Sequence, residues 1–88
     1  MDIQNIPPNR LIPYYLMSGY LYYHANAQVL SDADYDEICK RLLFEWDNIS
    51  HPHKGLVTRA DLEAGTGYAI KYTNMIKGAA MAWLAENK

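Results

Sequence analysis

Residues 20–36, YLYYHANAQVLSDADYD, decide the fold because they hold the end of one helix, a short loop and the start of the next. Ser31 is a favourable N-cap residue, since its hydroxyl accepts a hydrogen bond from a backbone N–H of the first turn. Asp34 stands three residues later, where a capping box places Glu or Gln. We therefore predict a helix that begins within a residue or two of Asp32.

The spacing of apolar residues predicts where the first of these two helices begins and where the second ends. The first helix is predicted to start near Leu11, with Pro13 in its first turn, after an extended lead-in at residues 1–10. Gly19 in this helix would let another backbone or an aromatic ring approach closely. The second helix is predicted to run to about Asn48, with an apolar stripe of Tyr35, Ile38, Cys39, Leu42, Leu43 and Trp46.

The rest of the chain predicts a turn and two more helices. Residues 51–55 form the turn, Thr58 and Asp61 cap a short third helix, and residues 65–67 end it. A fourth helix is expected over about 68–86, with the apolar residues Tyr68, Tyr72, Met75, Ile76, Ala79, Trp83 and Leu84. It either packs on the first two helices or pairs with a second copy, and we expect the former because two helices alone leave their stripes uncovered.

These elements predict an all-α fold, a small bundle of three to four helices in one domain of residues 1–88. The helix pair occupies residues 11–52, and the additional C-terminal helices occupy residues 58–87. The chain has one cysteine, so no internal disulfide is possible, and no apolar run reaches the length of a membrane span. We expect a cytoplasmic protein that binds no membrane.

Charge is distributed unevenly along the chain. Residues 1–52 carry three basic and seven acidic residues, a net charge of −4, whereas residues 53–88 carry five basic and three acidic residues, a net charge of +2. Proteins that bind duplex DNA usually present a basic face. The acidic N-terminal half argues against nucleic-acid binding and favours a cationic group or a basic partner.

One cluster of side chains is the candidate ligand-binding site. Asp32, Tyr35 and Asp36 fall at positions i, i+3 and i+4, so one turn of the second helix presents them on one side. The short loop before it folds this turn back toward Tyr22 and Tyr23. The expected result is an aromatic slot with two carboxylates at its rim, which suits a flat, cationic, hydroxylated ligand.

Tyr22 and Tyr23, the loop, and then Asp32-Ala-Asp-Tyr35-Asp36 resemble the small N-terminal helical domain, domain Ia, of bacterial NAD⁺-dependent DNA ligases. His51-Pro52 follows in the family's order, so the resemblance covers residues 15–52. In that family the domain captures the nicotinamide mononucleotide (NMN) half of NAD⁺. The resemblance implies that Tyr22, Tyr23, Asp32, Tyr35 and Asp36 bind NMN or NAD⁺.

The chain also departs from the family. Asn26 and Gln28 stand in the loop where relatives usually have Asp and Pro, and the helix at 68–86 has no counterpart in the resemblance. The Lys-x-Asp-Gly motif of the ligase nucleophile is absent, because neither Lys54 nor Lys77 has that context. We therefore expect no catalysis by this chain alone, although it remains possible as an accessory part of a ligase.

Structural explanations compete with these functional ones. The tyrosines are also compatible with core packing, and Asp32 and Asp34 with stabilisation of a helix N-terminus. His24, His51 and His53 lack the ligand set of a zinc site, so no metal is expected. Cys39 lies on the apolar stripe and is expected to be buried and inert.

Two functions of different classes remain open. The first is a stand-alone NMN- or NAD-binding module that works in trans with a separate adenylation subunit. The second is a small acidic interaction or inhibitor protein that keeps the fold without the ligand and binds a host protein. Small acidic chains that carry part of an enzyme are typical of phage or mobile-element genes, which implies a bacterial host. The oligomeric state, monomer or dimer, stays open.

Overall fold

The computed structural model describes residues 2–65 and 70–87, and helices dominate both ranges. The α-helices are α1 (Pro8–His24), α2 (Asp32–Phe44), α3 (Arg59–Ala64) and α4 (Asn74–Glu86). Short 3-10 helices are η1 (Ile3–Asn5), η2 (Trp46–Asn48) and η3 (Lys54–Leu56). No strand occurs within the described ranges, so the predicted all-α bundle is confirmed.

The start of α2 lies where the sequence predicts it. Ser31 is the N-cap, and its hydroxyl accepts a hydrogen bond of 3.1 Å from the Asp34 N–H. The α-helix ends at Phe44, earlier than predicted, and η2 continues the chain in a tighter turn. Of the predicted stripe, Ile38, Cys39 and Leu42 are buried, while Tyr35, Leu43 and Trp46 pack partly buried against the core.

Helix α1 begins three residues before the predicted Leu11. Pro8 occupies the first turn, where its missing N–H costs nothing, and Pro13 lies inside the helix rather than in its first turn. The prediction of an extended lead-in over residues 1–10 is therefore wrong, since η1 and the first residues of α1 are helical.

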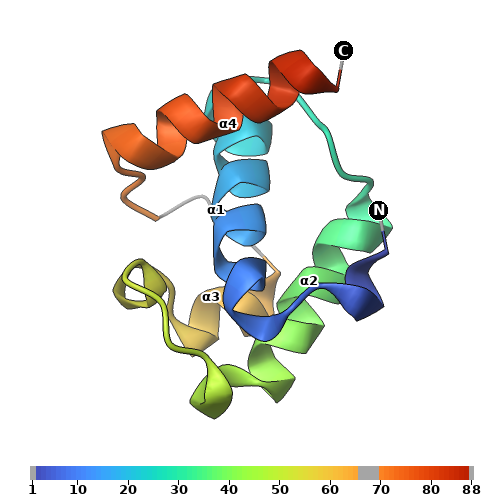
Figure 1. Ribbon diagram of the computed structural model, residues 1–88, viewed down its shortest axis with the longest axis vertical. Coiled ribbons are helices and arrows are strands. Elements are labelled where there is room, and N and C mark those ends of the chain that lie inside the picture. Colours follow the sequence, from blue (N-terminus) through green and yellow to red (C-terminus); the bar gives the residue numbers. More distant parts are fainter. Residues whose placement is uncertain (1, 66–69, 88) are drawn as a thin grey trace.

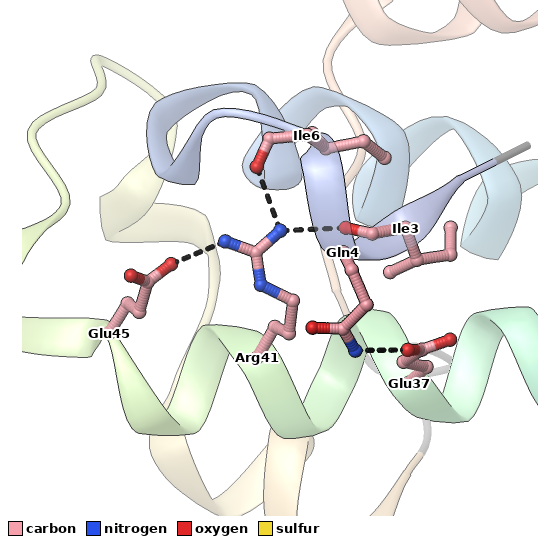
Figure 2. Close-up of polar contacts among 6 residues, drawn as sticks. All are labelled: Ile3, Gln4, Ile6, Glu37, Arg41 and Glu45. Carbon is pink, nitrogen blue, oxygen red and sulfur yellow. Dashed lines mark hydrogen bonds and ion pairs between the residues drawn. The ribbon is translucent and has the colours of Figure 1, made fainter.

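Arg41 of α2 holds the N-terminal segment in place (Figure 2). Its guanidinium donates one hydrogen bond of 2.7 Å to each of the Ile3 and Ile6 carbonyls and pairs with Glu45 at 2.7 Å. Gln4 adds a hydrogen bond to Glu37. Apart from the Arg41–Glu45 pair, these contacts link residues more than thirty positions apart, so local propensity does not reveal them.

The third helix agrees with its predicted caps. Thr58 and Asp61 form a capping box, and Gly65 ends the helix with a φ of 68°. Residues 66 and 67 of the predicted stop signal lie outside the described residues. The turn before α3 is held by Lys54, whose ammonium donates to the Trp46 and Ile49 carbonyls at 2.7 and 3.1 Å and lies over the Trp46 ring.

Helix α4 packs within the chain, as predicted, but chiefly on α1 rather than on both of the first two helices, and it crosses α1 at one end of the molecule (Figure 1). It begins at Asn74, after the N-cap Thr73, so the prediction of helix from about residue 68 is wrong for residues 70–73. Tyr68 lies outside the described residues.

The face of α4 that contacts α1 also differs from the predicted apolar set. Ile76 and Ala80 are buried, and Trp83 packs on Tyr14 with ring centroids 5.5 Å apart. Met75 is 72% exposed, and Ala79 is also exposed, so neither belongs to the core.

The core lies between α1 and α2, with α3 packed on α2 and α4 packed on α1. Its buried members are Ile3, Leu11, Ile12, Tyr15, Leu16, Leu30, Ile38, Cys39, Leu42, Ile49, Val57, Leu62, Ile70 and Ile76. Among the described residues, no helix is both long enough and apolar enough to cross a bilayer.

Candidate functional site

A cleft of about 260 Å³ opens between the C-terminal end of α1, the loop after it and the first turns of α2. All five residues singled out from the sequence line it, and we call it the acidic cleft. Its lining consists of Ser18, Tyr22, Tyr23, Gln28, Val29, Leu30, Asp32, Tyr35, Asp36 and Gly65. Two carboxylates and no cationic side chain are in this set, so the cleft favours a cationic or hydrogen-bond-donating ligand.

The loop that closes the cleft turns back at Asn26. This residue has a φ of 51°, a left-handed conformation that Asn tolerates better than most residues. The Ala27 N–H then donates 2.9 Å back to the Leu21 carbonyl, which closes the end of α1. The loop thereby brings the first turn of α2 beside Tyr22 and Tyr23.

The two adjacent tyrosines of α1 form one aromatic wall. Their rings meet edge to face, with centroids 4.9 Å apart and planes at 83°. Tyr22 is 52% exposed, which is unusual for a large aromatic residue that serves only the core. The Tyr22 ring is therefore accessible to a ligand that enters the cleft.

Tyr35 forms the opposite wall and is anchored from behind by Tyr15, with ring centroids 5.5 Å apart and planes at 19°. Burial raises the pKa of Tyr35, and the neighbouring Tyr15 and Cys39 add to this effect, so its phenol stays neutral. The Tyr35 hydroxyl is buried without a hydrogen-bond partner among the described residues.

Both carboxylates at the rim have weak partners on the protein. Asp32 accepts a hydrogen bond of 3.1 Å from the Gln28 amide, and Asp36 pairs with Lys40 at 2.9 Å. The side chains of Lys40 and Asp36 are 75% and 57% exposed, so water strongly screens the attraction between them. A bound ligand can therefore replace either partner at small cost.

Sequence reasoning missed part of the lining. Gln28 lies in the loop before α2 and not in a helix, so i, i+4 helical spacing gives no signal that its amide reaches the Asp32 carboxylate. Gly65 carries no such signal, because only the packing of α3 against α2 brings it to the cleft. Ser18 faces the cleft from α1, but its hydroxyl donates to the Tyr14 carbonyl at 2.6 Å.

Groups that could suggest catalysis or metal binding lie elsewhere. Cys39 is buried, as predicted, and burial raises its pKa to about 12, so a nucleophilic thiolate is disfavoured. The His51 and His53 rings lie tilted against each other in the loop before η3, and partial burial lowers the pKa of His51, with His53 adding to the effect. No three potential metal ligands gather anywhere in residues 2–65 or 70–87.

Comparisons of the chain with protein-family models, with curated proteins and with solved structures find no match.

Proposed function

We propose that the acidic cleft binds the nicotinamide ribose portion of NMN or NAD⁺, and that the chain acts as a stand-alone nucleotide-binding module related to the ligase N-terminal domain. The observation that supports this most is the convergence of Tyr22, Tyr23, Asp32, Tyr35 and Asp36 on one cleft from two helices. The same five residues follow from the ligand chemistry and from the family resemblance of the sequence.

The chemistry of the lining matches that ligand at three points. A pyridinium ring is cationic and flat, and the exposed face of Tyr22 offers a cation–π contact. The carboxamide and the ribose hydroxyls are hydrogen-bond donors, and Asp32 and Asp36 are acceptors at the rim. A neutral or anionic ring would lose the first of these contacts.

The size of the cleft limits the affinity. Its volume of about 260 Å³ lies just below the range of about 300–1,000 Å³ typical of small-molecule pockets. We therefore expect it to enclose one ring and part of a ribose, and to leave an adenylate half in solvent. The isolated chain should therefore bind NMN weakly, with a dissociation constant in the millimolar range.

Titration with NMN, followed by calorimetry and by NMR shifts of the backbone amides, tests the proposal. Asp36→Ala should abolish measurable binding and keep the fold, because Asp36 lies beyond the Ser31 cap. A matched control is Asp34→Ala, which removes the same charge from the same turn at a residue outside the cleft lining. Equal titration curves for Asp36→Ala and the unmodified chain would show that the assigned site is wrong.

A second candidate function, binding to another protein, is favoured by Phe44. Its side chain is 89% exposed at the end of α2, in a shallow groove whose lining also includes the acidic Asp36, Glu37 and Glu45 and the basic Lys40 and Arg41. An exposed aromatic residue in a groove of mixed charge suits a partner with an apolar contact surface, such as a separate adenylation subunit or a host protein.

Phe44→Ser separates the two candidates. If the chain acts by binding a protein, this variant should lose its partner in co-purification from the bacterial host while NMN titration stays unchanged. Asp32→Ala, at a residue that lines the acidic cleft and not this groove, should give the opposite pattern if the cleft carries the function.

A further inference from the structure

A second groove lies on the other face of the same end of α1. It has a volume of about 370 Å³ and is lined by Tyr20, His24, Ile70, Lys71, Tyr72 and Lys77; we call it the basic groove. Residues two positions apart on an α-helix point about 200° apart. Tyr20 and His24 therefore face away from Ser18 and Tyr22, which belong to the acidic cleft.

The polarity of the basic groove is opposite to that of the acidic cleft. Its lining includes two lysines and a histidine, and none of the described residues that line it is acidic. Lys71 and Lys77 are exposed, and neither forms an ion pair with another described residue. Two ammonium groups beside one groove repel each other, and an anion between them would relieve that repulsion.

Aromatic rings form the wall of the groove. The Tyr72 ring meets Tyr20 edge to face at 5.7 Å between centroids and meets His24 in the same way at 5.4 Å. Tyr20 and His24 themselves stack at 6.0 Å. The buried Ile70 adds an apolar residue to the lining. The lining therefore combines an apolar, aromatic part with cationic ends.

We propose that the basic groove is a binding site for a phosphate monoester, with the phosphate between Lys71 and Lys77 and an aromatic or apolar ester group against Tyr20 and Tyr72. Two lysines favour a compact dianion. The net charge of −2 disfavours a long polyanion such as a nucleic acid, which needs an extended basic surface. The site is separate from the acidic cleft and does not depend on the function proposed for it.

NMR titration with inorganic phosphate and with phenyl phosphate tests this assignment. We expect saturable shifts of the amides of Lys71, Tyr72 and Lys77, with phenyl phosphate binding more tightly than phosphate. Lys71→Gln combined with Lys77→Gln should weaken binding by about fivefold or more, an effect that high salt should reproduce in the unmodified chain.

The control variant combines Lys40→Gln with Arg59→Gln, which removes the same two charges from exposed residues on α2 and α3. It should bind phenyl phosphate as the unmodified chain does. Absence of saturable shifts, or equal weakening by the control variant, would overturn the proposal, because general electrostatic screening would then explain the effect.

Titration of the Asp36→Ala variant with NMN distinguishes an independent phosphate site from contact with the phosphate of a nucleotide bound in the acidic cleft. If the groove takes a separate phosphate monoester, NMN should still shift the Lys71 and Lys77 amides after the acidic cleft is disabled. If all shifts disappear together, the groove contacts only the phosphate of a cleft-bound nucleotide, and the assignment of an independent site is wrong.

Discussion

Asp36 and Lys40 form an ion pair of 2.9 Å along α2, and the same Asp36 carboxylate lines the acidic cleft. Both side chains are more than half exposed, so the pair is held weakly against water. The hydrogen bond that Lys40 donates to Asp36 raises the pKa of Lys40, and the negative charge of Asp36 acts in the same direction. A cationic ligand in the cleft must therefore compete with Lys40 for Asp36.

Lys40→Gln should strengthen NMN binding by about twofold to fivefold, because Asp36 then has no competing cation. Calorimetric titration at low ionic strength measures the change. Arg59→Gln removes one exposed charge from α3 and serves as the control, with no expected effect beyond general screening. Weaker binding by Lys40→Gln would show that Lys40 assists the ligand instead.

Ser31→Ala should lower the free energy of unfolding by about 1 kcal/mol, because the Asp34 N–H loses its hydrogen-bond acceptor. Urea denaturation followed by circular dichroism measures this difference. Ser50→Ala, at an exposed residue outside the helices, should change stability by less than about 0.5 kcal/mol. Equal effects of the two variants would mean that the cap does not stabilise α2.

Gly19→Ala should destabilise the fold by about 1–3 kcal/mol, because a Cβ there would lie 2.6 Å from the Tyr72 hydroxyl oxygen. In a Tyr72→Phe background the same change should cost much less, since the clashing atom is gone. Urea denaturation of the four chains of this double-mutant cycle measures the coupling.

Gly78→Ala is the control for helix propensity, because no group outside the adjoining stretch of its own helix lies within 4 Å of the position of its Cβ. This change in the interior of α4 should stabilise the fold by about 0.5–1 kcal/mol. Additive effects of Gly19→Ala and Tyr72→Phe would contradict the close approach seen in the structure.

Truncation after Gly67 should unfold the domain at any protein concentration, because it removes the helix that covers α1. Circular dichroism and sedimentation over a range of concentrations measure the outcome. A truncated chain that stays folded and only loses self-association would make α4 an arm for oligomerisation.

Two neighbouring positions of α4 refine this prediction. Ile76→Ala should cost about 2–5 kcal/mol, since the side chain is buried against the core. Met75→Ala should change stability by less than about 0.5 kcal/mol, since that side chain is 72% exposed. The opposite order would mean that α4 presents its other face to α1.

Stability should fall as pH rises above about 8.5, and Cys39 should account for much of the first part of this loss. Burial raises the pKa of the folded-state thiol to about 12, whereas an unfolded cysteine titrates near about 8.5. Unfolding therefore releases a proton between these values, and the stability due to the neutral thiol is complete below the lower one.

The expected loss from this group is about 1 kcal/mol between pH 8.5 and 9.5. Urea denaturation at these two pH values measures it, and Cys39→Ala, whatever its stability at neutral pH, should show a smaller change. Burial also raises the pKa of Tyr15, which extends the loss to higher pH. Equal pH dependence of the unmodified chain and Cys39→Ala would assign the effect to other groups.

Local signals in the sequence determined the helices and most of their boundaries. Ser31 with Asp34, and Thr58 with Asp61, are caps whose hydrogen bonds span three residues, so their geometry is encoded where they occur. The acidic cleft was also largely local, because a short loop joins the two helix ends that form it.

Tertiary structure decided what depends on distant contacts. Helix α1 starts at Pro8, in a segment that Arg41 anchors through the Ile3 and Ile6 carbonyls. Helix α4 is apolar on several sides, so its sequence does not select one buried face, and only packing against α1 distinguishes buried Ile76 from exposed Met75. The basic groove arises in the same way, because α4 and the segment before it place Lys77 and Lys71 beside the end of α1. These features depend on the burial of apolar area between elements that are distant in the sequence, whereas the helix caps depend on hydrogen bonds within a single turn.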